Sequence, residues 1–274
     1  MTNDILGLQG TRSLVLGGGY GIGWSSAELL ARSGADVVVA DLDPERATSA
    51  AGELAVHGGR THGLSGDVTV RAQAEAIVDD AAAFLGGLDV VINMIGFAAW
   101  GSLFDLTDET WDLDLARNLR HHIWVGRCAA RHMIDQGTGG AIAVVASVSG
   151  IYGAPMHGAY GAAKAALMDL TRTMAQEWGR HGIRVNAVAP DMINTPRIAS
   201  TYAAAGHDGS GAARDSIQPL GRMGTPEEIA GPLVFLCSDL ASFVTGQTII
   251  ADGGTHAAFP HFDSTTLMTD ASKS

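Results

Sequence analysis

The sequence predicts an α/β fold in which a doubly wound parallel sheet of about seven strands carries helices on both faces. Three observations support this fold class. Short apolar runs alternate with helix-like segments along most of the chain, as in strand–helix–strand units. Runs such as Val37–Ala40 are continuously apolar, which is typical of strands buried on both sides. With 274 residues, 46% apolar and 17% charged, the chain suits one large domain.

Glycine, proline and aspartate mark the ends of the elements in the first half of the chain. An apolar run at 12–16 predicts the first strand, and a glycine-rich turn leads into a helix at 22–33 that Gly34 ends. The second strand, 36–40, precedes a helix at 44–56 that Pro44 opens, as proline does at a first helical turn. The same alternation then predicts a strand at 61–65, a helix at 70–84 and a strand at 88–93.

Longer helices are predicted in the second half. Thr107 and Asp108 have cap-forming side chains and precede helical sequence that reaches Gln136. The remaining expected elements are a strand at 141–147, a helix at 158–179, a strand at 183–189, a helix at 226–236 and a strand at 247–251. We expect residues 1–260 to form a single domain, in which the segment 191–219, rich in Ala, Gly, Ser and Asp, is a lid over the substrate. Residues 261–274 are expected to be a polar tail.

Composition narrows the classes of partner. The net charge of −12 and the lack of a basic run argue against binding to nucleic acid or to anionic membranes. No signal peptide is recognisable, and no apolar run reaches the roughly 18 residues of a membrane-spanning helix. Cys128 and Cys237 lie in apolar, helix-like contexts and are expected to be buried thiols in a reducing compartment. We therefore expect a soluble, cytoplasmic protein.

A glycine-rich turn, Gly17–Gly23, lies between the first strand and the first helix, which is the context of a dinucleotide-binding fingerprint. There the backbone approaches a diphosphate and presents N–H groups at a helix N-terminus. Asp41 ends the second strand, where a carboxylate can accept both adenosine ribose hydroxyls and would repel a 2′-phosphate. Neither the residues flanking Asp41 nor Tyr20 in the loop are basic, so the sequence favours NAD over NADP.

Several other strands end in residues that are expected to share one cleft, because ligands of open parallel sheets bind at the carboxyl ends of the strands. Asp67 and Val68 are at the end of the third strand, Asn93 and Gly96 at the end of the fourth, and Ser147 at the end of the fifth.

Tyr160 and Lys164 lie four residues apart on the predicted helix 158–179 and therefore on one helix face. A nearby ammonium favours phenolate, so Lys164 is expected to lower the pKa of Tyr160 from its usual value of about 10. Such a tyrosine is suited to exchange a proton with an alcohol. Ser147, upstream of both, supplies a hydroxyl.

Together these motifs resemble those of the classical short-chain dehydrogenase/reductase family. They are Gly17-x-x-x-Gly21-x-Gly23, Asn93-Met-Ile-Gly96, Asn118, Ser147, Tyr160-x-x-x-Lys164, Arg184-Val-Asn186-Ala-Val-Ala-Pro190 and Asp252-Gly-Gly254. The resemblance implies a Rossmann fold, hydride transfer between a nicotinamide and a secondary alcohol or ketone, and a homotetramer or homodimer. Four departures are Leu16 for threonine, Met94-Ile95 for Asn-Ala, Asp191 for glycine, and a tail beyond Thr255 that is longer than in many members. The second puts the polar support of the fourth strand in doubt.

The resemblance also implies roles for single residues. Tyr160 is the acid/base, Lys164 lowers its pKa and holds the nicotinamide ribose, Ser147 bonds the substrate oxygen, and Asn118 supports a water-linked proton relay. The implied cofactor-binding residues are Gly17, Gly19, Tyr20, Gly21, Ile22, Gly23, Asp41, Leu42, Asp67, Val68, Asn93, Gly96, Tyr160, Lys164, Pro190, Ile193 and Thr195. Substrate contact is expected at Ser147, Ser149, Tyr152, His157 and Met192.

The substrate is expected to be a bulky or apolar alcohol or ketone, because Phe97, Trp100 and Met156 also lie in the stretches where the family binds substrate. No metal is predicted: His121 and His122 lack further ligands at matched spacing and are expected at the surface or an interface. Two other functions stay open. One is a 3-oxoacyl-carrier-protein-type reductase, which usually favours NADP; the other is a non-catalytic dinucleotide-sensing protein, which would not need the four catalytic-type residues together.

Overall fold

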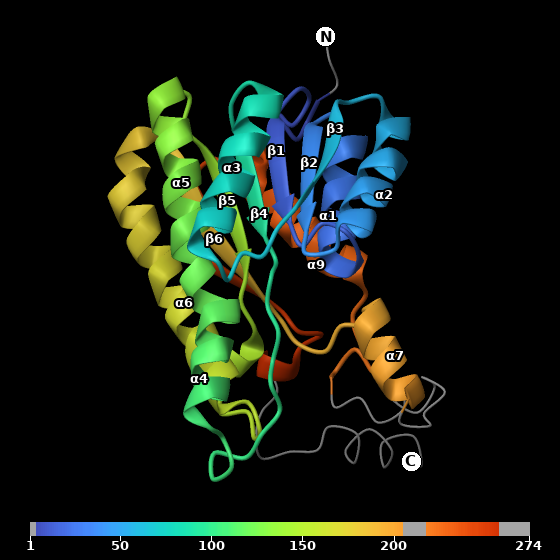
Figure 1. Cartoon of the computed structure of the whole chain (residues 1–274), viewed down its shortest axis with the longest axis vertical. Helices are drawn as coiled ribbons and strands as arrows, with labels where there is room; N and C mark the ends of the chain where they lie inside the picture. The colour runs from blue at the N-terminus through green and yellow to red at the C-terminus, as the bar shows by residue number, and fades with distance from the viewer. Residues whose placement is uncertain (1–3, 205–217, 258–274) are drawn as a thin grey trace, which may run out of the picture.

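Seven parallel strands form one sheet in the computed structural model, which describes residues 4–204 and 218–257 (Figure 1). The strands are β1 (Arg12–Leu16), β2 (Asp36–Asp41), β3 (Thr61–Ser65), β4 (Val90–Asn93), β5 (Gly140–Val145), β6 (Ile183–Pro190) and β7 (Thr248–Ala251). Their order in the sheet is β3-β2-β1-β4-β5-β6-β7. The chain therefore reverses direction across the sheet between β1 and β4, and a doubly wound sheet opens a ligand crevice at such a point.

Helices cover both faces of the sheet, as predicted (Figure 1). They are α1 (Gly21–Arg32), α2 (Pro44–Leu54), α3 (Arg71–Leu85), α4 (Asp108–Leu115), α5 (His121–Gln136), α6 (Gly158–Trp178), α7 (Pro196–Ala204) and α9 (Pro226–Cys237). One apolar core joins α3, α5 and α6 to the sheet. A second core lies on the other face, beneath α1, α2 and α9. The strands between them are buried on both sides, which explains their continuous apolar runs.

Side-chain caps fix where several helices begin. Asp43 accepts hydrogen bonds from the N–H groups of Glu45 and Arg46 at the start of α2. Thr107 caps α4 in the same way by accepting from the Thr110 N–H, as its position in the sequence predicts. Thr225 and Glu228 form a reciprocal capping box at the start of α9.

The predicted helix 107–136 is not continuous. A π-helical turn, Ala116–Arg120, separates α4 from α5. Asn118 lies in this turn, and its side-chain amide donates to the Asp114 carbonyl at 2.9 Å, the group that an α-helix would pair with the Asn118 N–H. Single π turns of this kind occur frequently at functional sites. The other predicted elements match the structure within two residues at each end.

Two predicted segments are described only in part or not at all. Of the expected lid at 191–219, residues 205–217 lie outside the described residues, and the rest includes α7. The expected tail at 261–274 also lies outside them. Among the helices of the described ranges, none is both long and apolar enough to cross a membrane.

Candidate active site

A cavity of about 550 Å³ lies at the carboxyl ends of the strands around the crossover between β1 and β4. Most of the residues predicted to bind a cofactor line it: Gly17, Tyr20, Gly21, Ile22, Asp41, Leu42, Asp67, Val68, Gly96 and Thr195. The other predicted residues, Gly19, Gly23, Asn93, Tyr160, Lys164, Pro190 and Ile193, are not part of its wall. Ile193 instead lines a second cavity of about 440 Å³, together with Gly253 and Gly254.

The glycine turn is shaped by close backbone packing. Gly17 has a left-handed φ of +78°, and a side chain on Gly23 would collide with the Gly17 carbonyl oxygen. Gly19 leaves room for Asp41, whose Oδ2 lies 2.5 Å from the place a Cβ would take. The turn can therefore lie flat against the start of α1, where free N–H groups suit the diphosphate of a dinucleotide.

Asp41 is nearly buried and is paired with a residue that the sequence analysis missed. The Arg46 guanidinium lies 2.9 Å from Asp41 Oδ1 and stacks over the Tyr20 ring at 4.8 Å from its centroid. The sequence analysis considered only the immediate neighbours of Asp41. Arg46 reaches back because Asp43 starts α2 and turns the chain toward the strand end.

Tyr160, Lys164 and Ser147 come together beside this cavity, as predicted. Helix α6 stacks Tyr160 and Lys164 one turn apart, with Lys164 Nζ 5.6 Å from the Tyr160 ring centroid. Lys164 is completely buried, and its Nζ donates to the Val145 carbonyl at the end of β5 at 2.7 Å. Ser147 lies just beyond β5, not in it as predicted, and is hydrogen-bonded to Tyr160.

The expected lowering of the Tyr160 pKa by Lys164 is wrong for this structure. Burial raises the pKa of Tyr160, although its hydrogen bond with Ser147 and the charge of Arg197 act in the opposite direction. Burial also lowers the pKa of Lys164 to about 7. The sequence analysis counted the attraction between the two groups and not their removal from water, which disfavours both charged forms.

Asn118 and Gly96 connect the cavity to the catalytic-type residues. Asn118 is buried, and its side chain makes two hydrogen bonds with the Phe97 backbone, accepting from N–H at 2.9 Å and donating to the carbonyl at 2.7 Å. A Cβ on Gly96 would lie 2.8 Å from Asn118 Oδ1 and 2.9 Å from Lys164 Nζ. A glycine at 96 therefore lets the cavity wall approach Lys164 closely.

His121 and His122 are buried, which corrects the expectation that they lie at the surface or an interface. His121 Nδ1 lies 3.2 Å from the Asn93 side-chain amide, and its Nε2 lies 3.0 Å from the Arg117 carbonyl. Burial, followed by the charge of Lys164, lowers the pKa of His121 to about 3. His121 is thus a neutral partner for Asn93 and supplies polar support that Met94 and Ile95 lack.

His122 is buried as deeply, and neither of its ring nitrogens has a hydrogen-bond partner among the described residues. Burial, then the nearby His121 and Lys164, lowers its pKa well below the usual value. The sequence could not show that His122 faces inward, because an inward-facing helix position is recognised by apolar residues, and His121 and His122 are both polar.

The predicted substrate residues divide into two groups. Ser149 and His157 are close to the catalytic-type residues: Ser149 Oγ lies 3.4 Å from His157 Nδ1, and the His157 and Tyr160 ring centroids are 5.4 Å apart. Tyr152 and Met192 have exposed side chains and line neither cavity described above. Asp114, which the sequence analysis missed, is buried, and this burial raises its pKa; its carboxylate accepts from the Ala99 N–H.

One group in the described ranges has metal-ligand geometry, although no metal was predicted. The ligand atoms of Asp79, Cys128 and His132 lie within 4.8 Å of one another on α3 and α5. None of the three lines the cavity. Cys128 is partly exposed rather than fully buried as expected, and its partial burial and the adjacent Asp79 raise its pKa to about 12. Cys128 and His132 are both hydrogen-bonded to the Asp79 carboxylate.

Known proteins match nearly the whole chain. A family model described as enoyl-(acyl carrier protein) reductase matches residues 17–256. The 2,5-dichloro-2,5-cyclohexadiene-1,4-diol dehydrogenase of Sphingobium indicum is 39% identical over 90% of this chain and 97% of its own length. The 3-oxoacyl-[acyl-carrier-protein] reductase FabG of Thermotoga maritima is 36% identical over 90% and 98%. A short-chain type dehydrogenase/reductase from Mycobacterium marinum superposes with a TM-score of 0.84 at 33% identity, covering 93% and 99%.

Proposed function

The chain belongs to the classical short-chain dehydrogenase/reductase family, and from this premise we propose that it is an NAD-dependent dehydrogenase of a secondary alcohol, or a reductase of the matching ketone. The observation that supports this most strongly is the grouping of Tyr160, Lys164 and Ser147 beside Gly96, which lines the cavity at the glycine turn. Enzymes of this family use a nicotinamide cofactor.

Tyr160 is proposed to move the proton of the reaction. Its raised pKa keeps the phenol protonated, so in reduction it can donate to the substrate oxygen while Ser147 hydrogen-bonds the same atom. In oxidation Tyr160 must first pass its own proton to a base, and only then can it accept the proton of the substrate oxygen. A bound nicotinamide supplies the acceptor or donor of the hydride. Lys164, with a pKa of about 7, can exchange a proton near neutral pH and is suited to reset the protonation of Tyr160.

NAD is proposed as the preferred cofactor. The carboxylate of Asp41 faces the cavity, where it can accept hydrogen bonds from ribose hydroxyls and repels a 2′-phosphate. Arg46 is the competing feature, because a guanidinium is a good phosphate ligand. Its ion pair with Asp41 at 2.9 Å keeps that guanidinium occupied. Parallel kinetics with NAD and NADP measure the balance directly.

The proposed substrate is a bulky or apolar secondary alcohol or ketone. Phe97, Trp100 and Met156 leave exposed apolar side chains near the catalytic-type residues, and the Sphingobium relative acts on a cyclohexadiene diol. A 3-oxoacyl-carrier-protein reductase is the second candidate, favoured by the Thermotoga relative; the description of the matching family model shares with it the acyl-carrier-protein substrate but names a different reaction. Asp41 argues against it, since such reductases usually take NADP.

Four further parts of the proposal concern organisation. We propose a homotetramer or homodimer, a single domain over residues 1–260, and a substrate lid in the part of 191–219 that the structure describes, where Thr195 and Arg197 line the cavity. A cytoplasmic location agrees with the two cysteines, both free thiols.

Replacing Tyr160 tests the mechanism. Tyr160→Phe should lower turnover by about 10²- to 10⁴-fold, because the proton donor is lost, while NADH still binds with an unchanged fluorescence signal. Tyr152→Phe removes the same hydroxyl from a ring on the preceding loop and should lower turnover far less. Near-wild-type turnover by Tyr160→Phe, on any alcohol the wild type oxidises, would exclude the proposed role.

A further inference from the structure

His157 carries a buried nitrogen without a partner beside the catalytic tyrosine. It lies at the N-terminal cap of α6, three residues before Tyr160. Its Nδ1 faces Ser149 Oγ at 3.4 Å, whereas its Nε2 is buried and has no hydrogen-bond partner in the described part of the chain. A buried polar atom left unpaired destabilises the folded chain. Native proteins seldom keep such an atom unless a ligand or another function requires it.

The imidazole is neutral near pH 7, because burial lowers the pKa of His157, and the buried Asp114 carboxylate offsets this only in part. A neutral imidazole has one donor and one acceptor nitrogen. When Nδ1 accepts from the Ser149 hydroxyl, Nε2 carries the proton and donates. When Ser149 accepts instead, Nε2 is an acceptor. An alcohol hydroxyl can pair with Nε2 in either state, since it both donates and accepts.

His157 is preceded by a residue with an unusual, hydrogen-bonded backbone and is covered by a largely exposed tryptophan ring. Met156, the preceding residue, has a left-handed φ of 67°, which is rare for a residue other than glycine and is typical of functional sites. The Met156 carbonyl accepts from the Gly101 N–H at 3.1 Å. The Trp100 ring covers the imidazole at a centroid distance of 4.2 Å but is 72% exposed. A substrate ring can therefore pack against Trp100 while an oxygen reaches Nε2.

We propose that His157 Nε2 binds a second oxygen of the substrate, so that the enzyme prefers diols and hydroxyketones to alcohols with one oxygen. This inference rests on the proposed function, in which Tyr160 holds the reacting oxygen. The two rings lie side by side, with centroids 5.4 Å apart. Two oxygens of one small ring or short chain can therefore contact both side chains. His157 is a specificity residue, and the hydride still leaves from the carbon next to Tyr160.

Two matched substitutions distinguish the contribution of His157 Nε2 from that of Nδ1. Asparagine places its polar atoms near Nδ1 and has none at Nε2, whereas glutamine places a polar atom close to Nε2. The measurement is kcat/KM with NAD for cyclohexanol, cyclohexane-1,2-diol and cyclohexane-1,4-diol. The readout is the diol-to-cyclohexanol ratio, in which any loss common to both substrates cancels. The wild-type ratio for at least one diol should exceed about 10, should fall about tenfold or more in His157→Asn, and should recover in His157→Gln.

Three outcomes would overturn the inference. A wild type that oxidises cyclohexanol as well as both diols has no second-oxygen preference, and the proposed function survives. An equal ratio in wild type and His157→Asn shows that His157 acts only on the local structure. A wild type that binds NADH, by fluorescence titration, but oxidises none of the three alcohols with NAD contradicts the proposed function itself, and the inference falls with it.

Discussion

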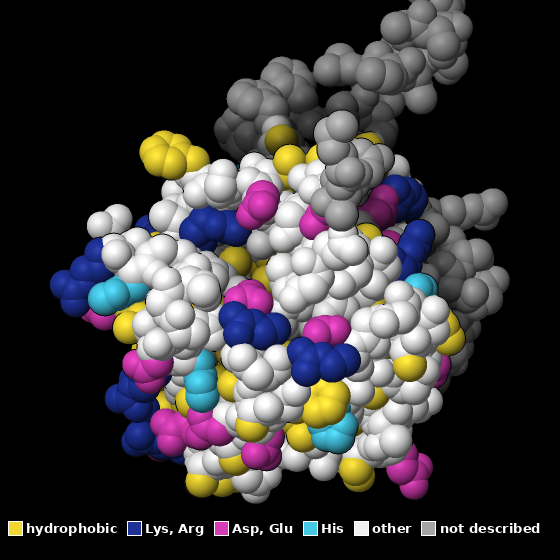
Figure 2. All heavy atoms as spheres, turned by 90° about the horizontal axis from the view of Figure 1, so that it is seen from above, with side chains coloured by type: hydrophobic (Ala, Val, Ile, Leu, Met, Phe, Trp, Pro, Cys, Tyr) yellow, Lys and Arg dark blue, Asp and Glu magenta, His cyan; other side chains and the backbone are white. Residues whose placement is uncertain are grey.

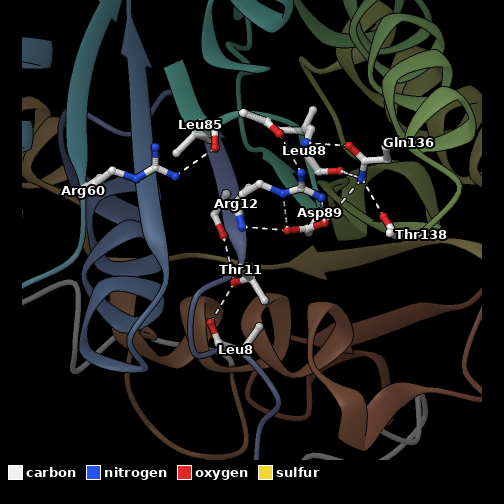
Figure 3. Close-up of polar contacts among 11 residues, drawn as sticks. Leu8, Thr11, Arg12, Arg60, Leu85, Leu88, Asp89, Gln136 and Thr138 are labelled. Carbon is white, nitrogen blue, oxygen red and sulfur yellow. Dashed lines mark hydrogen bonds and ion pairs between the residues drawn. The ribbon is translucent and has the colours of Figure 1, made fainter. Parts of the chain in front are cut away.

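The edge of the sheet at which the strands begin and the edge at which they end differ in how they hold most of their charged side chains, the Asp41–Arg46 pair at the second edge being an exception. At the edge where the strands begin, charges are paired. The Arg12 guanidinium donates two hydrogen bonds to the Asp89 carboxylate, at 2.6 and 2.8 Å, and Gln136 donates to the adjacent Leu88 carbonyl (Figure 3). Arg60 pairs with Asp36 at 2.8 Å and also donates to the Leu85 carbonyl. Figure 2 looks onto this end of the molecule, where basic and acidic side chains lie next to one another.

At the edge where the strands end, several polar groups are buried without a partner of opposite charge. Among the residues that the structure describes, Lys164 has the Val145 carbonyl as its hydrogen-bond partner, and burial lowers its pKa to about 7. Tyr160 is held in its protonated form by burial. His122, behind them, has no hydrogen-bond partner among the described residues.

This difference separates stability from function. A paired charge at the first edge keeps its ordinary ionised form, so the pair can tie strands and helices together. Burial of an unpaired group at the second edge shifts its pKa so that the neutral form is favoured, which costs the fold stability. For Lys164 the shift brings the pKa to about 7, which suits proton transfer. Removing a charge should therefore weaken the fold at one edge and only the activity at the other.

The largest expected effect follows from Lys164→Met, which keeps the length of the side chain and removes its charge. Turnover should fall by about 10²- to 10⁴-fold because the proton carrier beside Tyr160 is lost. Stability to urea at pH 7 should be unchanged or higher, because no ammonium has to be buried. Steady-state kinetics and urea unfolding of the same preparation give both values.

The pH dependence of the same variant gives an independent check. Folding lowers the pKa of Lys164 from about 10.5 to about 7, so between these values the unfolded chain binds more protons than the folded chain. Wild-type stability should therefore gain from this group as the pH rises from 7 to 9, and any advantage of Lys164→Met should shrink. If Lys164→Met were less stable than the wild type at both pH values, the Lys164 charge would stabilise the fold, as the charges of Arg12 and Asp89 do.

Asp89→Ala probes the opposite edge and should have the next largest effect. Burial raises the pKa of Asp89, but its hydrogen bonds with Arg12 outweigh this and hold it below the usual value. Removing the carboxylate leaves the Arg12 guanidinium partly buried and unpaired, so the free energy of unfolding should fall by about 2–3 kcal/mol. Asp169→Ala breaks the exposed pair with Arg172 and should change stability far less. Equal effects of the two substitutions would contradict the special role of the first edge.

The fold could be predicted from the sequence because its elements carry local patterns. Continuous apolar runs mark the strands, and proline, glycine and cap residues mark the helix ends. The spacing of Tyr160 and Lys164, and the strand end that precedes Ser147, were enough to group these three residues, because parallel strands bring their carboxyl ends to one edge.

The rest of the site depends on packing that no local pattern reveals. Whether His121 faces the core is decided by the helices against which α5 packs. Arg46 reaches Asp41 only because α2 folds back from its cap. The loop that contains Phe97 and Ala99 packs on the π turn, and its N–H groups donate to the side chains of Asn118 and Asp114. These contacts between distant segments accompany the π turn and the burial of Asp114. The pKa of Tyr160 was mispredicted for the same reason, since desolvation is a property of the folded chain.

The smallest expected effect concerns His122, whose pKa burial lowers well below its usual value of about 6.5. Below pH 6.5 the unfolded chain takes up a proton that folded His122 does not, so stability should fall as the pH decreases. His122→Leu lacks this proton uptake and should lose about 1 kcal/mol less between pH 7.5 and 5.5 than the wild type. Comparing each protein with itself at two pH values cancels the effect of the changed packing, and His57→Leu, at an exposed position, corrects for a sequence with one histidine fewer. If His122→Leu lost stability as steeply as the wild type, the imidazole would have to be paired and titrating normally, and this edge would not differ from the first at that residue.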